Sequence, residues 1–258
     1  MTARSNEVQR VALVTGGGSG IGQSTARLLA SRGWAVVVTG RDEARLRATI
    51  DGLEGGPGSY VVADMSTTAA AEHVVETVRG RHGRLDVLVC AHGVLGTMKP
   101  LTELTDADVT EALAINLVGP VVAAAAAAPL LSESRGSIVN VASINALQAE
   151  PEAVPYGVSK SGLIGFTRYA AVELAAVGVR VNAVLPGWVR TPMTEYLFGS
   201  PEFEGRPISA NLMQRPAHPD EIAQVIAFLA SEEAGFMTGS NVVADGGQVV
   251  RLADLTPA

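Results

Sequence analysis

The segment that most constrains the fold is a glycine-rich turn between an apolar run and a helical pattern. Residues 11–15 are apolar or β-branched, residues 16–22 read GGGSGIG, and a helical pattern continues to Arg32. Glycines let a backbone approach a phosphate closely, and the first turn of a helix offers unpaired N–H groups to an anion. This order predicts a strand–loop–helix unit of the kind that binds a dinucleotide, rather than an ordinary glycine-rich turn.

Apolar runs and helical patterns alternate along the rest of the chain. Strands are predicted at 11–15, 34–39, 60–64, 85–90, 137–142, 179–185 and 241–244. Helices are predicted up to Arg32 and at 43–53, 69–81, 106–131, 156–176 and 219–231, with a bend near Gly119 and Pro120 in the fourth. Because the strands alternate with helices and are continuously apolar, they predict an α/β fold with a mostly parallel sheet covered on both faces.

Neither an interdomain linker nor an internal repeat interrupts this pattern. One domain is therefore predicted over residues 9–250, with short flexible tails at 1–8 and 251–258. The irregular, proline-containing segment at about 188–213 is predicted to form a lid. A chain of 258 residues that is 47% hydrophobic can bury a sizeable core.

The charge and the composition exclude several classes of function. The formal net charge is −7 and only two lysines occur, so no basic face for nucleic acid is expected. Cys90 is the only cysteine, which fits a reducing compartment, and the polar residues 1–10 lack the apolar core of a signal peptide. The longest apolar stretch, 117–131, is too short for a membrane span. We expect a cytoplasmic protein without a membrane partner, and the scattered histidines predict no metal site.

Tyr156 and Lys160 are four residues apart, so on a helix they share one face. A neighbouring cation favours the phenolate, which predicts a Tyr156 pKa below the usual value of about 10. Ser143 follows a predicted strand, at the edge where open α/β sheets bind ligands, and no Gly-x-Ser-x-Gly elbow surrounds it. Each feature alone could be a surface pair or a loop cap. Together, after the glycine-rich loop, they predict a general acid/base near neutral pH.

Three further polar residues have both a functional and a structural interpretation. Asp64, at the end of the third strand, could accept a hydrogen bond from an adenine amino group or cap the turn that follows. Asn116 lies inside a helix, where Asn is unfavourable, so its amide could hold a water or a carbonyl, or be a satisfied buried amide. His92 could be a base, although such a residue is more often structural, and Cys90 is expected to be a small buried hydrophobe.

Taken together, these motifs resemble the short-chain dehydrogenase/reductase family, in its compact single-domain branch, over about residues 8–250. The resemblance rests on the pattern TGxxxGIG at 15–22, on YxxxK at 156–160, and on Asp64, Asn116, Ser143, Pro186, Gly187 and Thr191. It implies a doubly wound (Rossmann) seven-stranded parallel sheet, a nicotinamide cofactor, and a redox reaction between a carbonyl and an alcohol. It also implies a homotetramer (or homodimer), formed through the two long helices that are rich in small residues.

The resemblance implies a role for each matching residue. Tyr156 would exchange a proton with the substrate oxygen, which Ser143 would fix and polarise. Lys160 would hold the nicotinamide ribose and lower the Tyr156 pKa, and Asn116 would anchor a proton-relay water. The implied cofactor-binding residues, besides Tyr156 and Lys160, are Gly16, Ser19, Gly20, Ile21, Gly22, Arg41, Asp64, Met65, Ala91, Gly93, Pro186, Gly187, Val189 and Thr191.

One segment departs from the family pattern. The family usually carries Asn-Asn-Ala-Gly after the fourth strand, whereas this chain has VCAHG at 89–93. Cys90 replaces an Asn that often braces neighbouring strands, and His92 adds a bulky polar group. We expect a change in local rigidity and in the floor of the pocket rather than in the chemistry.

The end of the second strand predicts the cofactor. NAD enzymes usually place a carboxylate there for the ribose hydroxyls, and that carboxylate would repel a 2′-phosphate. Here the corresponding residue is Gly40, and Arg41, which suits a phosphate, follows at once. Asp42 lies one residue too late, and residues 17–19 supply no second basic group. NADP(H) is therefore favoured over NAD(H), with an NAD-dependent dehydrogenase as the alternative and a non-catalytic dinucleotide sensor as a remote one.

The substrate prediction rests on the apolar inner face of the lid. A mostly apolar ketone or secondary alcohol is expected, without a metal, and His92 could complete the pocket. The residues predicted to bind the substrate are Ser143, Asn145, Leu147, Tyr156, Trp188, Met193, Tyr196 and Leu197.

Overall fold

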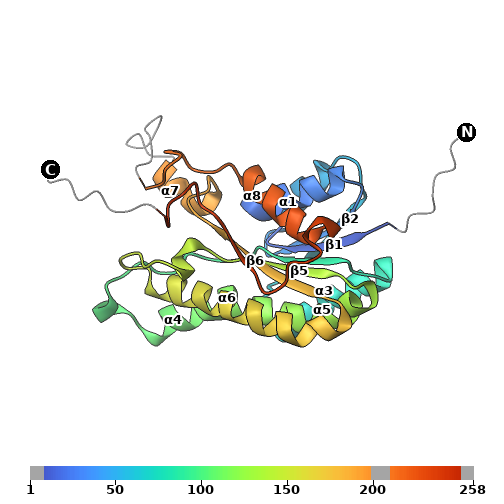
Figure 1. Ribbon diagram of the computed structural model, residues 1–258, viewed down its shortest axis with the longest axis horizontal. Helices are drawn as coiled ribbons and strands as arrows, with labels where there is room; N and C mark the ends of the chain where they lie inside the picture. The colour runs from blue at the N-terminus through green and yellow to red at the C-terminus, as the bar shows by residue number, and fades with distance from the viewer. Residues whose placement is uncertain (1–8, 199–209, 251–258) are drawn as a thin grey trace, which may run out of the picture.

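The computed structural model describes residues 9–198 and 210–250 (Figure 1). The predicted tails at 1–8 and 251–258, and residues 199–209 of the predicted lid, lie outside these ranges. The division into a domain, a lid and tails therefore stays a prediction.

Seven strands form one sheet in which every neighbouring pair is parallel. They are β1 (Val11–Thr15), β2 (Ala35–Gly40), β3 (Gly58–Val62), β4 (Val87–Cys90), β5 (Ser137–Val141), β6 (Arg180–Pro186) and β7 (Asn241–Ala244). Their order is β3-β2-β1-β4-β5-β6-β7. The predicted seven-stranded parallel sheet is confirmed. The third strand ends two residues earlier than predicted, so Asp64 lies in the loop beyond it.

Helices connect successive strands. They are α1 (Gly20–Ser31), α2 (Glu43–Asp51), α3 (Thr68–His82), α4 (Asp106–Leu113), α5 (Gly119–Ser134), α6 (Val154–Leu174), α7 (Glu195–Phe198) and α8 (Pro219–Ala230). Short 3₁₀ turns lie at Leu101–Glu103, Ile144–Ala146, Ala175–Val177, Pro192–Thr194 and Glu232–Ala234.

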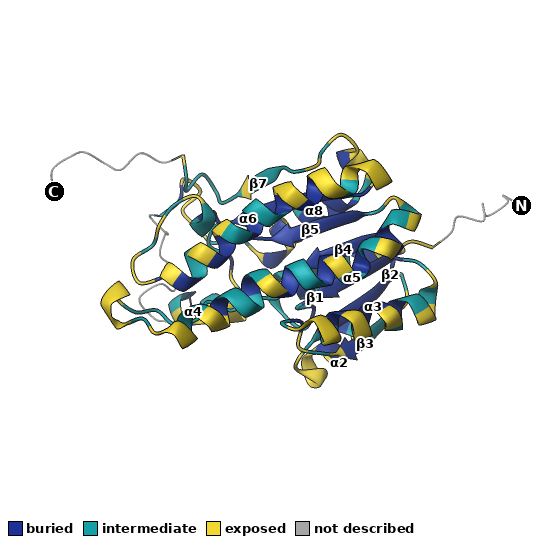
Figure 2. Ribbon diagram, turned by 90° about the horizontal axis from the view of Figure 1, so that it is seen from below, coloured by how far each residue is buried: buried dark blue, intermediate teal, exposed yellow. Residues whose placement is uncertain are grey.

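The helices cover the two faces of the sheet in separate layers (Figures 1 and 2). Residues of α1, α2 and α8, such as Leu29, Leu46 and Ile226, pack in one apolar cluster with alternate residues of the strands. Residues of α3, α5 and α6 pack in a second cluster on the opposite face, where Val74 and Leu131 are fully buried. Both faces of the strands are thus buried, which explains why their sequences are continuously apolar.

The strand order reverses between β1 and β4, because β2 and β3 lie on one side of β1 while β4 to β7 lie on the other. Thr15 pairs with Cys90, so the loops that follow β1 and β4 leave the sheet side by side. Ligands of open α/β sheets bind in the crevice at such a point, beyond the carboxyl ends of the strands.

The long helix predicted over 106–131 is bent by a π turn. Residues Ala114–Val118 form this turn between α4 and α5, and the N–H of Gly119 bonds to the carbonyl of Ala114. The bend lies one turn before the predicted Gly119–Pro120 position. The whole helical run of 29 residues, 106–134, is long and apolar enough to cross a membrane by length and composition alone. It is longer than the apolar stretch 117–131 that was predicted to be too short for a span. Its α5 part packs on α3 and the sheet, as a core helix does.

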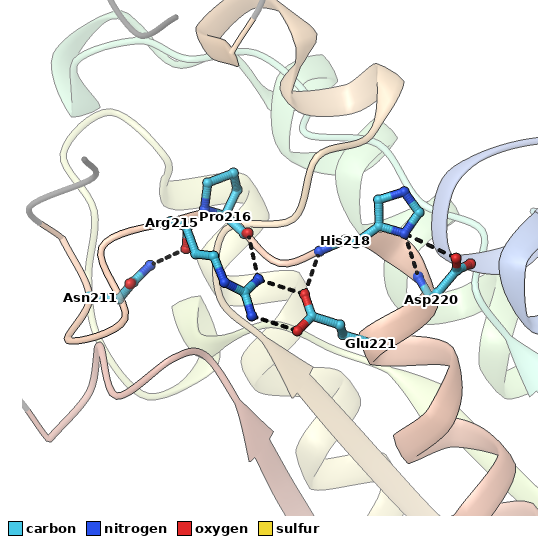
Figure 3. A network of polar contacts seen from close by, with 6 residues as sticks. All are labelled: Asn211, Arg215, Pro216, His218, Asp220 and Glu221. Atoms are coloured by element: carbon cyan, nitrogen blue, oxygen red, sulfur yellow. Dashed lines mark hydrogen bonds and ion pairs between the residues drawn. The ribbon is translucent and has the colours of Figure 1, made fainter. Parts of the chain in front are cut away.

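A polar network fixes the segment that returns from the lid to α8 (Figure 3). The Arg215 guanidinium donates to both carboxylate oxygens of Glu221, each at 2.7 Å. The same carboxylate accepts from the backbone N–H of His218, which begins the capping box of α8. The Asn211 amide donates to the Arg215 carbonyl at 3.0 Å. These bonds attach residues 211–218 to the rigid domain.

Candidate functional site

A cavity of about 330 Å³ lies at the switch point of the sheet. Its walls come from the loops after β1, β2, β3, β4, β5 and β6 and from the first turns of α6. Every residue predicted to bind the cofactor lines this cavity, including Gly16 and Arg41 at one end and Lys160 and Thr191 at the other.

The glycine-rich loop leaves no room for side chains. Gly16 has φ +66°, and a Cβ there would lie 2.7 Å from the backbone of His92. A Cβ at Gly22 would lie 2.4 Å from the Gly16 carbonyl oxygen. Because the loop packs closely against its own helix and against the segment after β4, its N–H groups are held where a pyrophosphate fits. The residues present therefore fit a dinucleotide.

Two arginines and one aspartate line the end of the cavity beyond β2. Asp42 is engaged with its own helix: its carboxylate accepts from the Arg45 backbone N–H at 3.1 Å and lies 3.3 Å from Arg45 Nε. Arg41 lies in the loop just before this cap. Arg45 is a second cation at this end, and sequence reasoning missed it because it belongs to α2 rather than to the glycine loop.

Asp64 and Met65 line the cavity beyond β3. The Asp64 carboxylate accepts from the Ser66 backbone N–H at 3.1 Å, and this bond is the main reason that its pKa is lowered. Met65 is 3% exposed. Asp64 therefore caps the turn while also facing the cavity, so the two interpretations are compatible.

Tyr156, Lys160 and Ser143 meet where the cavity approaches β5. Tyr156 lies in the first turn of α6 and Lys160 one turn later, with Lys160 Nζ 5.7 Å from the Tyr156 ring centroid. Lys160 is 5% exposed and donates to the Val141 carbonyl at 2.9 Å. Ser143 caps the short turn after β5 and is hydrogen-bonded to the Tyr156 hydroxyl.

The expected lowering of the Tyr156 pKa is wrong for the protein without cofactor. Burial raises the pKa of Tyr156, Ser143 partly offsets this, and the Glu150 carboxylate raises it further. Burial also lowers the pKa of Lys160 to about 8. The ammonium lies beside the ring and bonds to a backbone carbonyl, so desolvation outweighs its attraction for the phenolate.

Asn116 is a fully buried brace at the centre of the π turn. Its Oδ1 accepts from the Val94 N–H at 2.8 Å, and its Nδ2 donates to the Val94 carbonyl at 2.9 Å and to Ser159 Oγ at 3.0 Å. The amide thus joins the loop after β4 to the helix that carries Tyr156. Its side chain is satisfied by protein groups, so the water-anchoring role stays a prediction.

His92 is partly buried beside the glycine-rich loop and lines the first cavity. Its Nδ1 lies 2.6 Å from the Thr15 hydroxyl, which also accepts from the Ala91 N–H at 3.1 Å. Nε2 faces the π turn, where a Cβ at Gly119 would lie 2.6 Å from it. Burial and the Lys160 charge lower the pKa of His92 to about 4, so the ring is neutral near pH 7. This geometry favours the structural interpretation of His92.

A second cavity of about 320 Å³ opens beyond Ser143 and Tyr156. Asn145, Trp188, Met193 and Tyr196, which were predicted to bind the substrate, line it. The short helix α7 is held by Phe198, whose ring packs edge-on against Trp188 with a centroid distance of 6.1 Å.

Leu147 and Leu197 do not line this cavity, contrary to prediction. Leu147 is 53% exposed because it ends the short turn after Ser143 and faces solvent. Successive residues of a helix project about 100° apart. Tyr196 therefore faces the cavity from α7 while Leu197 does not.

Sequence reasoning also missed Glu150 and Gln248, which line the second cavity. Thr15 was included only as part of the glycine-rich pattern, and its hydroxyl bridges β1 and the loop after β4. The roles of all three residues depend on the pairing of distant segments, so no local pattern predicts these roles. Within 9–198 and 210–250, no group of three His, Cys, Asp or Glu side chains is arranged to hold a metal ion.

Comparison with known proteins assigns the family. A family model described as enoyl-(acyl carrier protein) reductase matches residues 16–248. The A-factor type γ-butyrolactone 1′-reductase (1S-forming) of Streptomyces virginiae is 41% identical over 245 residues, covering 92% of this chain and 95% of that protein. The 3-oxoacyl-(acyl carrier protein) reductase of Thermotoga maritima is 36% identical, covering 93% and 98%.

Solved structures agree with this result. A short-chain type dehydrogenase/reductase from Mycobacterium ulcerans has a TM-score of 0.89 and 31% identity, over 94% of this chain and 90% of that one. The chain therefore belongs to the short-chain dehydrogenase/reductase family. It is an oxidoreductase that acts on CH–OH and C=O groups, and its family implies an NAD(P) cofactor.

The neutral, partly buried His92 predicts a loss of stability in acid. The folded-state pKa of about 4 lies below the ordinary 6.5, so between these values the unfolded chain binds a proton that the folded one does not. The contribution of neutral His92 to the free energy of unfolding is fully present above pH 6.5 and is lost as the pH falls through 4. The loss from this residue is about 3 kcal/mol. In urea unfolding measured from pH 7.5 to 4, the free energy of unfolding should fall less steeply with decreasing pH in His92→Ala than in the wild type. The exposed His73→Ala serves as control, and equal slopes in all three proteins would contradict the prediction.

Proposed function

We propose that this protein interconverts a ketone and a secondary alcohol with NADP(H) as the hydride carrier. NADP(H), when bound, supplies the hydride to the carbonyl carbon or takes it from the alcohol carbon. The observation that carries the proposal is that Ser143 and Tyr156 line both cavities, while Lys160 lines the first cavity beside the Tyr156 ring. The relatives named above, both called reductases, support it.

Each residue has a distinct part in reduction. The Tyr156 hydroxyl donates its proton to the substrate oxygen, and Ser143 donates a hydrogen bond that holds that oxygen in place. Lys160, charged below a pH of about 8, holds the nicotinamide ribose and stabilises the phenolate left behind. The raised Tyr156 pKa favours the protonated phenol in the unliganded protein and so suits a proton donor. No metal is required in this scheme.

Removing the phenolic hydroxyl should separate chemistry from binding. Tyr156→Phe is expected to lower kcat for ketone reduction about 10²–10⁴-fold, because general acid catalysis contributes on that order. Binding of reduced cofactor, followed by its fluorescence, should remain within a few-fold. Tyr169→Phe is the matched control, since Tyr169 lies on the same helix and is 76% exposed. Retained turnover in Tyr156→Phe would reject the acid/base role.

The preference for NADP(H) is supported by the charges beyond β2. Gly40 carries no carboxylate, and Asp42 is occupied by the Arg45 backbone and side chain. Arg41 and Arg45 together present two guanidinium groups at this end of the cavity. Guanidinium groups suit a 2′-phosphate, whereas a free carboxylate would repel it.

Neutralising these arginines should change cofactor choice. Arg41→Ala is expected to lower the NADPH/NADH ratio of kcat/KM by about tenfold or more, because each hydrogen bond to a charged group contributes roughly 1.5–3 kcal/mol. Arg45→Ala should act in the same direction. Arg47→Ala is the control, since Arg47 lies on the same helix as Arg45, bonds to Glu43 and to Tyr60 of β3, and lies outside the cavity. A wild-type preference for NADH would favour the alternative, an NAD-dependent dehydrogenase.

The remote alternative is a non-catalytic dinucleotide sensor. A sensor needs the loop but has no use for a buried Ser143–Tyr156–Lys160 group beside a second cavity. A panel of ketones and alcohols, followed by the absorbance of the reduced nicotinamide with each cofactor, distinguishes the two classes.

The outer faces of α4, α5 and α6 support a homotetramer or homodimer. Tyr169 and Val172 on α6 are 76% and 78% exposed, and Val118 is 44% exposed. On α5, the small residues Ala125, Ala126 and Ala128 are outside the buried core and would let a second copy approach closely. A cytoplasmic location also belongs to the proposal, supported by Cys90, which is a free, buried thiol.

Charges placed on this face should dissociate the assembly. Light scattering of the wild type at micromolar concentration is expected to give the mass of four or two chains of 26.6 kDa. Tyr169→Glu combined with Val172→Glu should give a smaller species with unchanged circular dichroism, because burying unpaired carboxylates is costly. A monomeric wild type would contradict the proposal.

A further inference from the structure

The second cavity has an apolar wall and one charged group. Leu95, Met98, Ile144, Trp188 and Met193 supply apolar side chains. Polar side chains come mainly from the loop after Ser143 and from Gln248. Among the described residues that line this cavity, Glu150 is the only charged one, and none is lysine, arginine or histidine.

The Glu150 carboxylate is tied to the turn that carries Ser143. The Asn145 amide donates to Glu150 Oε2 at 2.9 Å, and the Asn145 backbone N–H donates to Ser143 Oγ at 3.2 Å. The loop is also attached to the segment after β4, because the Lys99 N–H donates to the Glu152 carbonyl at 3.1 Å. The carboxylate therefore has a fixed place relative to the residues that hold the reacting oxygen.

The charge of Glu150 acts on two tyrosine side chains that line the cavity. It raises the pKa of Tyr156 from one side and that of Tyr196, on α7, from the other. No ion pair to Glu150 occurs within residues 9–198 and 210–250. Gln248 Oε1 is a second acceptor, buried and without a hydrogen-bond partner in the same ranges. Glu150 has a donor in Asn145 but no cation beside it, and Gln248 Oε1 has no donor among the described residues. Acceptors of this kind in a largely apolar cavity gain free energy when a ligand supplies a further donor.

We infer that Glu150 selects ketones that carry a hydroxyl group away from the reacting carbonyl, and that it disfavours ketones that carry a carboxylate. This inference rests on the proposed function, since it names the substrate class of the same site. The hydroxyl donates to the carboxylate while the carbonyl oxygen lies at Tyr156 and Ser143. A substrate carboxylate placed there would face a like charge, with no described cation in the cavity to offset it.

Matched substrate sets test the inference. One set is cyclohexanone, 4-hydroxycyclohexanone and 4-oxocyclohexanecarboxylate, and a linear set is pentan-2-one, 5-hydroxypentan-2-one and 4-oxopentanoate. Within at least one set, the wild type should prefer the hydroxyketone over the plain ketone by about tenfold in kcat/KM, because a site built around a hydroxyl rejects the analogue that lacks it. The carboxylate should be the poorest substrate in both sets.

Glu150→Gln removes the charge but keeps an acceptor for Asn145. It should reduce the hydroxyketone-to-ketone ratio by about tenfold, through a higher KM for the hydroxyketone, since hydrogen bonds to charged groups are the stronger ones. It should also bring the kcat/KM of the ketone that carries a carboxylate closer to that of the plain ketone. Glu152→Gln is the control, because Glu152 is exposed, lies two residues away and does not line the cavity. That control should keep all the wild-type ratios.

The outcomes separate this inference from the proposed function. If the wild type reduces the plain ketones as well as the hydroxyketones, or if Glu150→Gln keeps the wild-type ratios, the selection by Glu150 is overturned while ketone reduction stands. If no ketone of either set is reduced with NADPH or NADH, both are overturned. Cofactor binding by fluorescence, measured on every variant, shows that the protein used is folded.

Discussion

The parallel pairing of β1 with β4 is the constraint on which the site depends. It places the glycine-rich loop beside the loop after β4, with Thr15 opposite Cys90. The Thr15 hydroxyl then donates to the Val89 carbonyl and accepts from the Ala91 N–H, so one side chain connects the two loops. A shift of one residue in the strand pairing would turn every side chain of the shifted strand to the opposite face of the sheet. The Thr15 hydroxyl would then no longer lie between the two loops. The cavity therefore inherits its shape from the register of the sheet.

The π turn connects the loop after β4 to the helix that carries the reacting groups. Asn116 bonds both backbone groups of Val94 and also Ser159, so it fixes the loop after β4 to α6. The π turn also accommodates the departure at His92, because Gly119 leaves space for the imidazole. His92 is bulky where the family usually has a small residue, and it packs against Gly119, a residue without a side chain 27 positions later in the chain. The change affects the wall behind the loop and leaves Tyr156 and Lys160 in place.

Local patterns were sufficient to predict the sheet, the loop and the Tyr156–Lys160 pair. Seven apolar runs and a glycine loop are short-range signals, and a four-residue spacing defines one face of a helix. The Tyr156 pKa was predicted with the wrong sign, because the spacing indicates the nearby ammonium but not the burial around it. Arg45 and Glu150 were missed because their importance depends on loops that meet only in the folded chain. Leu197 was misplaced because apolar character does not tell which side of a short helix faces the cavity.

Opposite charges mark the two ends of the site. Arg41 and Arg45 lie at the far end of the first cavity, and Glu150 lies in the second. The two cavities share the wall to which Ser143 and Tyr156 contribute, where the phenol is partly buried, and the buried Lys160 ammonium lines the first cavity. The proposed preference for NADP(H) places the 2′-phosphate at the end with Arg41 and Arg45, and the proposed hydroxyketone would lie in the second cavity beside Glu150. Both proposals therefore assign one ligand to each cavity, with Ser143 and Tyr156 at the wall between them.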